Sequence, residues 1–130
     1  MILIDSSAWI EFLRDTGSNA CIQVNDSLDK PFAVADPIRM ELLAGARSER
    51  QLHSLRGLLA RGTTLQTLPL DFDEAARIHR QCRLNGDTVR KLIDCLIAGI
   101  AIRHDIPLLH QDADFDRLSR HTGLEIVGSL

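Results

Sequence analysis

Short apolar runs alternate with longer amphipathic stretches along the whole chain. The apolar runs are bounded by polar or turn-forming residues, which predicts buried strands at 2–4, 32–35, 64–68, 106–109 and 124–127. The stretches between them favour helices, which we expect at about 6–13, 20–28, 36–45, 49–60, 71–84, 89–103 and 114–120. Strands that alternate with helices predict an α/β fold with a mostly parallel sheet and helices on both faces.

Polar residues mark several of the predicted helix starts. Ser6 or Ser7 is expected to cap the first helix, and the pair at 36–37, Asp-Pro, is typical of a helix start. Asp71 resembles the head of a capping box, so we expect the helix there to begin at this residue. In a parallel sheet, ligand sites form beyond the carboxyl ends of the strands, which makes side chains that follow a strand candidates for the site.

The size and composition of the chain predict one globular domain spanning residues 1–130. Hydrophobic residues make up 45% and charged residues 25%, which excludes global disorder. The longest uncharged apolar run, 95–102, is far shorter than the roughly 20 residues of a membrane span, and the N-terminus lacks the basic region of a signal peptide. Three widely spaced cysteines make neither a disulfide framework nor a CxxC metal site, so we expect no membrane association and a cytoplasmic location.

The charge balance is mildly acidic, with a net charge of −3, although thirteen of the fifteen bases are arginines. A protein that holds nucleic acid by charge alone is usually basic. Five bases nevertheless gather within fifteen residues of the sequence: Arg77, Arg80, Arg83, Arg90 and Lys91. They form a candidate phosphate-binding track, and the alternative is that they line an ordinary solvated helix face.

Four carboxylates lie at positions where a merely solvated acid is not expected. Asp5 directly follows the first strand, and Asp112 follows the strand that ends at 109. Glu41 lies on the apolar stripe of its helix, and Asp94 interrupts a helix that is apolar on nearly every face. Because a buried, unpaired carboxylate costs several kcal/mol, Asp94 must have a partner, such as an arginine, backbone N–H groups or a metal ion.

Each of these acids also has a simpler explanation when it is taken alone. Asp94 can pair with an arginine, Asp5 can cap a helix, and Glu41 can be a surface acid. The acids at 112, 114 and 116 suit the first turn of a helix. Taken together, however, two acids at strand exits and two on inward helix faces can meet at one place. Carboxylates that lie within a few Å of each other repel one another unless a cation lies between them. A ligand set made only of oxygens favours Mg²⁺ or Mn²⁺.

Four motifs in the right order and spacing resemble those of the PIN-domain nucleases, and among them the VapC toxins of prokaryotic toxin–antitoxin pairs. These motifs are Ile4-Asp5-Ser6-Ser7-Ala8-Trp9, Met40-Glu41-Leu42-Leu43-Ala44-Gly45, Asp94-Cys95-Leu96-Ile97-Ala98 and Asp112-Ala113-Asp114-Phe115. The resemblance covers essentially the whole chain. It implies a PIN-like, Rossmann-like three-layer α/β/α sandwich and a Mg²⁺- or Mn²⁺-dependent endoribonuclease that leaves 5′-phosphate and 3′-hydroxyl ends.

The resemblance also implies roles for individual residues and partners. The catalytic and metal-binding quartet would be Asp5, Glu41, Asp94 and Asp112, with Asp114 as an auxiliary metal-binding acid. Ser7 matches a small hydroxyl residue near the first acid of the family. Many relatives have Thr or Ser at the position of His110, so the hydrogen bonding around the fourth acid is expected to differ here. The implied partners are an RNA substrate, with structured RNA such as tRNA a candidate, a cognate VapB-type antitoxin, and a second copy in a homodimer and higher toxin–antitoxin assembly.

A metal-dependent reaction needs no protein nucleophile, because a bound ion activates water and neutralises charge on the phosphate. Asp5 and Asp94 are expected to be the most direct ligands, since both come from buried elements. His110 contacts substrate, acts in proton transfer, or is a structural histidine at a strand end. Ser7 and the five bases are the other candidate substrate contacts. The antitoxin groove is expected near the early helices and the helix that carries Glu41.

Other classes of protein fit the sequence less well. A phosphate-accepting receiver domain needs a paired acid after the first strand, and a haloacid-dehalogenase-type phosphatase needs an aspartate where Ser7 stands. No nucleophile-elbow signature surrounds the serines or Cys95. The remaining alternative is a non-catalytic PIN-like scaffold that binds a partner protein and keeps the acids for structure.

Overall fold

The computed structural model describes residues 1–128 and contains a four-stranded parallel sheet in the order β3-β2-β1-β4. The strands are β1 (Ile2–Ile4), β2 (Phe32–Ala35), β3 (Thr63–Leu65) and β4 (Leu108–Leu109). The first helices in the sequence are α1 (Ser6–Leu13), α2 (Asn19–Ser27), α3 (Asp36–Ala44) and α4 (Glu49–Leu59), and the later ones are α5 (Pro69–Leu84), α6 (Leu92–His104) and α7 (Ala113–His121).

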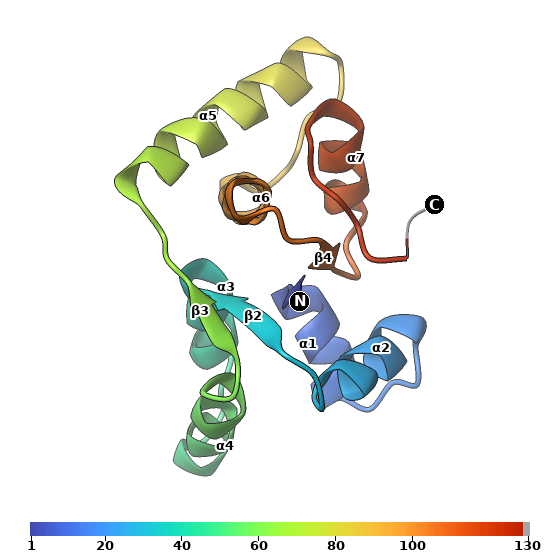
Figure 1. Ribbon diagram of the computed structural model, residues 1–130, viewed down its shortest axis with the longest axis vertical. Helices are drawn as coiled ribbons and strands as arrows, with labels where there is room; N and C mark the ends of the chain where they lie inside the picture. Colours follow the sequence, from blue (N-terminus) through green and yellow to red (C-terminus); the bar gives the residue numbers. More distant parts are fainter. Residues whose placement is uncertain (129–130) are drawn as a thin grey trace.

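The helices cover both faces of the sheet, as the sequence pattern predicts. Figure 1 shows α5, α6 and α7 on one side of the strands and α1, α2 and α4 on the other. The core is built from the central strands and from α6, whose residues 94–101 are all buried. A helix with almost no polar face must be enclosed, so α6 lies in the middle of its layer, packed against α5 and α7. No helix among residues 1–128 is long and apolar enough to cross a membrane.

Several element ends differ from the predictions for physical reasons. The cap of α1 is Asp5, not Ser6 or Ser7, because the Asp5 carboxylate accepts the Ser7 N–H at 2.9 Å. Helix α5 begins at Pro69 rather than at Asp71, because proline suits the first helical position, and Asp71 reaches back to the N–H of Leu68 at 2.7 Å. The predicted strand at 64–68 is correspondingly shorter, and it ends at 65.

Two further differences affect the site. Helix α6 begins at Leu92, three residues later than predicted, because Val89 packs into the core and the chain then bends at Arg90 before an extended Lys91. The predicted last strand at 124–127 is reduced to one parallel bridge between Leu108 and Ile126. The first of these shifts leaves Arg90, at a bend, and Lys91, which is extended, on a non-helical segment that leads to the acidic site.

Candidate active site

Asp5 stands at the carboxyl end of β1, the central position for a site above this sheet. It is 3% exposed, and its Oδ2 accepts hydrogen bonds from the backbone N–H of Ser7 at 2.9 Å and from Ser7 Oγ at 2.5 Å. Its Oδ1 is buried and has no donor among the described residues. Burial raises the pKa of Asp5, and the Ser7 bonds oppose that rise. Asp5 is therefore both a helix cap and an acid with one open oxygen.

Asp94 lies in the first turn of α6 and is also 3% exposed. Burial, and then the charges of Asp5, Asp112 and Glu41, raise its pKa to about 7, whereas Lys91 lowers it. Asp94 Oδ2 has no hydrogen-bond donor within residues 1–128, and the cation that faces it is Lys91 Nζ at 4.0 Å rather than an arginine. The arginine-pair explanation of this acid is therefore wrong for the described part of the chain.

Glu41 is half-buried on α3 and turns toward the first acid. Its Oε1 accepts a hydrogen bond from Ser6 Oγ at 3.0 Å. Burial raises its pKa, the Ser6 bond lowers it, and the charge of Asp5 raises it further. The two serines after β1 thus hold one acid each, Ser6 holding Glu41 and Ser7 holding Asp5.

Asp112 and Asp114 bring a third segment to the same place. Asp112 caps α7, and its Oδ1 accepts the N–H of Asp114 at 3.0 Å. Asp94, Asp112 and Asp114 each place one carboxylate oxygen within 4.8 Å of the others, a spacing that suits a shared cation. Both oxygens of Asp114 also face arginines, Arg90 Nε at 3.2 Å and Arg117 Nη1 at 2.8 Å. Asp114 therefore anchors the rim of the site as well as adding to its negative charge.

His110 orients the loop that carries Asp112. Its Nδ1 accepts the backbone N–H of Asp112 at 3.0 Å, so the ring proton lies on Nε2, which is 3.2 Å from Asp116 Oδ1. The next residue of this loop, Gln111, donates its N–H to Ser7 Oγ at 2.9 Å. The imidazole thus supplies the acceptor that a hydroxyl would supply at this position.

The five predicted bases separate into two groups. Arg90 and Lys91 reach the acids, with Arg90 Nη2 3.8 Å and Lys91 Nζ 3.6 Å from the Asp112 carboxylate. Arg77 instead binds Glu74 and Gln81 on its own helix, α5. The two remaining bases, Arg80 and Arg83, are exposed on α5. The acids are therefore edged by the segment before α6, and the α5 arginines form a separate surface.

Three residues that the sequence analysis did not select support the site. Ser6 holds Glu41, and Arg117 joins Asp114 to Asp87. Asp87 also binds Arg120 at 3.1 Å and His121 at 2.9 Å, which ties the segment before α6 to α7. The only available signal was their proximity in sequence to the acids and to the turn at 85–88.

The donor set suits a hard divalent cation. Two buried carboxylates on different elements keep oxygens without donors, and the ligands on offer are all oxygens. Burial of like charges at one place is unfavourable unless a cation offsets it. Burial is the main cause of the raised pKa of Asp5, Glu41 and Asp94, and repulsion by neighbouring carboxylates adds to it at Glu41 and Asp94.

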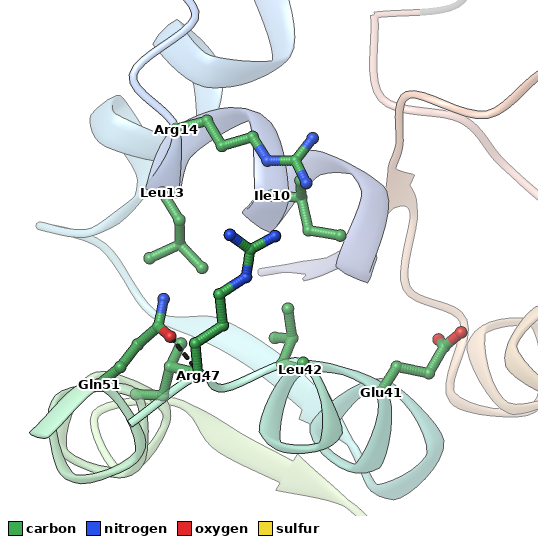
Figure 2. Close-up of a pocket in the computed structure, with 9 residues that line it drawn as sticks. Ile10, Leu13, Arg14, Glu41, Leu42, Arg47 and Gln51 are labelled. Atoms are coloured by element: carbon green, nitrogen blue, oxygen red, sulfur yellow. Dashed lines mark hydrogen bonds between the residues drawn. The ribbon is translucent and has the colours of Figure 1, made fainter. Parts of the chain in front are cut away.

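An apolar groove begins beside the acids and runs between α1 and the helices α3 and α4. Its walls include Ile10, Leu13, Leu42 and Leu55, and Glu41 stands at one end. Figure 2 shows the guanidinium groups of Arg14 and Arg47 extending over this groove from opposite walls. The groove therefore combines an apolar floor with a basic rim and one acidic end.

Comparison with known proteins gives one consistent answer. The family model for the PIN domain matches residues 2–121. VapC ribonuclease Mb1587 of Mycobacterium bovis and ribonuclease VapC11 of Mycobacterium tuberculosis are each 43% identical to this chain over 129 residues. In each case the match covers 96% of this chain and 96% of the relative.

Solved structures have the same fold at much lower identity. The DNA-bound VapBC complex of Salmonella typhimurium contains a chain with a TM-score of 0.76 and 20% identity, and the coverage is 97% of each chain. VapBC-1 of nontypeable Haemophilus influenzae has a TM-score of 0.75 and 15% identity, and covers 97% of this chain and 96% of that one. The chain belongs to the PIN-domain family and, within it, to the VapC ribonucleases.

Proposed function

We propose that this chain is the toxin of a type II, VapBC-type toxin–antitoxin pair and acts as a divalent-metal-dependent endoribonuclease. The observation that carries the proposal is the pair of open, buried oxygens, Asp5 Oδ1 and Asp94 Oδ2, in a cluster of four acids. A structural acid with this burial would have its oxygens paired. The names of the 43% identical relatives, which are ribonucleases, support the same reaction.

The residues divide the work of phosphodiester hydrolysis. A bound Mg²⁺ or Mn²⁺ would lower the pKa of a water and neutralise charge on the phosphate. Asp5 and Asp94 would hold this ion directly, and Glu41 and Asp112 would complete the site directly or through water. Ser6 and Ser7 fix the acids in place through their hydroxyls. Water attacks phosphorus and the bond to the 3′-oxygen breaks, which leaves 5′-phosphate and 3′-hydroxyl ends.

The substrate we propose is a structured RNA, with tRNA as the first class to test. Aromatic residues make up only 4% of the chain and the single tryptophan is buried. The protein therefore has few aromatic side chains on which unpaired bases could stack. The exposed arginines of α5, Arg80 and Arg83, are suited to backbone phosphates. Such RNA is in the cytoplasm, and three buried free cysteines suit a reducing compartment.

A cleavage assay with matched variants tests the reaction. Purified protein is incubated with tRNA and either Mg²⁺ or Mn²⁺, as the intact chain and as Asp5→Asn and Asp94→Asn. Asp73→Asn is the control, because it makes the same change at an exposed residue of α5. We expect the control to cut and both site variants to lose cleavage. Equal cleavage by all four proteins would reject the nuclease proposal, and sequencing of RNA ends in cells would identify the substrate.

The antitoxin we propose is a VapB-type segment that lays apolar side chains into the groove between α1 and α3. Acidic residues on that segment would meet Arg14 and Arg47, and a basic residue would reach Glu41 at the end of the groove. Leu13→Asp would place a charge on an exposed part of the apolar wall. We expect this variant to lose co-purification with the product of a neighbouring small gene, while Asp73→Asn retains it.

The homodimer we propose uses a second apolar face that borders the site. Exposed Met40 on α3 and exposed Phe72 on α5 line a hollow together with Pro37, Ile93 and Leu96 among others. Because Met40 precedes Glu41 and Ile93 precedes Asp94, a second copy here would bring two sites together. Phe72→Asp is expected to convert a dimer to a monomer in light scattering.

The alternative function is a non-catalytic scaffold that keeps the acids for structure. The orphaned oxygens of Asp5 and Asp94 disfavour it, because they cost stability and bind nothing in the described chain. A scaffold would bind its antitoxin and leave RNA intact with either metal.

A further inference from the structure

Three of the four acids fall into two halves of the site according to the cations that already face them. Asp5 and Asp94 are each 3% exposed, and each keeps one buried oxygen for which residues 1–128 supply no hydrogen-bond donor. Asp112 instead faces two side-chain cations, Lys91 Nζ at 3.6 Å and Arg90 Nη2 at 3.8 Å. Within residues 1–128, Asp5 has no ion-pair partner and Asp94 faces one cation at 4.0 Å, whereas Asp112 faces two cations at shorter distances. Positive charge is therefore concentrated on the Asp112 side of the site.

Lys91 stands between these halves. Its ammonium is 4.0 Å from Asp94 Oδ2 and 3.6 Å from Asp112 Oδ2, both longer than a hydrogen bond, so it adds charge without occupying either oxygen. Its side chain is 52% exposed and rises from an extended residue at the start of α6, which leaves the ammonium at the solvent edge of the acids. Asp94, and then Asp112, Glu41 and Asp5, raise the pKa of Lys91, while burial lowers it.

Arg90 is less suited to this position. Its Nε is 3.2 Å from Asp114 Oδ2, and Asp114 is fully buried and also bound by Arg117. Arg90 is therefore held by a buried partner. The Lys91 ammonium makes no hydrogen bond within the described chain and can turn from the acids toward an incoming phosphate.

We propose that the site takes one divalent cation, on Asp5 and Asp94, and that Lys91 supplies the second positive charge, against the scissile phosphate above Asp112. This inference rests on the proposed ribonuclease function. During hydrolysis water adds to phosphorus, the bond to the 3′-oxygen breaks, and that oxygen takes up a proton. Lys91 forms no bond in this step and stabilises the charge that builds on the phosphate oxygens.

Metal binding without RNA tests the first part. Mn²⁺ is titrated calorimetrically into the intact chain, Lys91→Met, Lys91→Arg and Lys30→Met. Lys30 is the other lysine of the chain. It is exposed just before β2, at the amino end of the strands, whereas the acids lie at the carboxyl end. We expect one ion per chain in the parent protein, and about tenfold tighter binding in Lys91→Met because a neighbouring positive charge is gone. Lys91→Arg and Lys30→Met should bind like the parent.

Cleavage kinetics at saturating Mn²⁺ test the second part. We expect kcat of Lys91→Met to fall at least tenfold with little change in KM, although its ion is bound more tightly. Lys91→Arg should recover most of kcat because it restores the charge, and Lys30→Met should cut like the parent. A fall caused by weaker metal binding would disappear at saturation, whereas this one would not.

Three results would overturn the inference. Two ions per chain in the parent protein would reject the one-ion arrangement. Unchanged Mn²⁺ affinity in Lys91→Met would show that the ammonium does not act on the site. Unchanged kcat in that variant would remove Lys91 from catalysis. If the parent protein cuts no RNA at all, the proposed function fails, and the calorimetric titration still decides the charge arrangement.

Discussion

Asp71 and Asp94 occupy matching positions in neighbouring helices, yet their surroundings are opposite. Each lies in the first turn of its helix, and the two are 2% and 3% exposed. Asp71 accepts two bonds from the Arg103 guanidinium, at 2.8 and 3.0 Å, and one from the N–H of Leu68. Asp94 has Lys91 at 4.0 Å and one oxygen with no donor among the described residues.

The pKa of each acid records this difference. The Arg103 bonds lower the pKa of Asp71, whereas burial and three neighbouring carboxylates raise that of Asp94 to about 7. Burial alone therefore does not distinguish a structural acid from a functional one. What distinguishes them is whether the fold supplies the partners that a buried carboxylate needs.

The largest predicted effect comes from neutralising the two acids in turn. Asp94→Asn is expected to lower RNA cleavage roughly 100-fold or more, because it removes one of the two proposed direct ligands of the activating ion. The same change should leave the metal-free protein as stable or more stable, because it removes a buried charge that is repelled by its neighbours. The measurements are initial cleavage rates and thermal melting in a chelator.

Asp71→Asn should give the reverse result. Loss of the Asp71 charge leaves Arg103 without its carboxylate partner, although Arg103 keeps its bond to the Gln66 carbonyl. We expect the free energy of unfolding to fall by about 2 kcal/mol, moderated because the Arg103 side chain is 32% exposed. Cleavage at a temperature where the variant is folded should stay near the parent rate. If Asp94→Asn is the less stable protein and Asp71→Asn the less active one, the distinction between these acids is wrong.

The pH dependence of stability is the second way to separate the two acids. The pKa of Asp94 is raised in the folded protein. The stability that this shift adds to the fold is fully present below pH 3.8, the ordinary pKa of an aspartate, and is lost as the pH rises through about 7. Between pH 5 and pH 8, the melting temperature of the metal-free parent should therefore fall by about 5 °C more than that of Asp94→Asn.

Asp71 should act in a separate window with the opposite sign. The pKa of Asp71 is lowered in the folded protein. The stability that this shift adds to the fold is therefore present above pH 3.8 and is lost as the pH falls below that value. Melting curves of Asp71→Asn should match the parent slope between pH 5 and 8 and differ from it only in stronger acid. Parallel slopes for the parent and Asp94→Asn between pH 5 and 8 would contradict the raised pKa.

Sequence alone located the acids that meet because the strand and helix patterns are local. Asp5 follows an apolar run and Asp94 interrupts another, so their burial is visible without a structure. The parallel sheet then follows from alternating elements, and its carboxyl edge brings these segments together.

Partner choice was not visible in the sequence, because it depends on contacts between distant residues. Arg103 lies 32 residues from Asp71, and nothing local indicates that it pairs there and leaves Asp94 without an arginine. The start of α6 was misplaced for the same reason. Buried Val89 and the contacts of Asp87 with α7 keep residues 87–91 out of the helix, although the residues at 89–91 fit a helical pattern.

A smaller effect is expected at His110, which supports the site without holding an unpaired charge. His110→Ala removes the acceptor for the Asp112 N–H. We expect the cleavage rate to fall about tenfold, as is typical when a hydrogen bond that orients a metal ligand is removed. His110→Ser restores a short acceptor and should recover part of the rate. Because the effect acts through Asp112, it should be absent in a protein that already carries Asp112→Asn. An equal further loss in that double variant would place the imidazole on the substrate instead.

The smallest effect should come from Arg77, whose surroundings resemble those of Asp71 more than those of Asp94. Its guanidinium already binds Glu74 and Gln81 on an exposed face of α5, so it is poorly available to phosphate. Arg77→Ala should change cleavage less than twofold and stability by less than about 0.5 kcal/mol. Arg83→Ala, which removes an exposed arginine from the same helix, should weaken RNA binding and make it less dependent on salt. Measurement of KM for tRNA between 50 and 200 mM salt compares the two, and a larger salt effect from Arg77 would show that pairing on the helix does not withdraw an arginine from RNA.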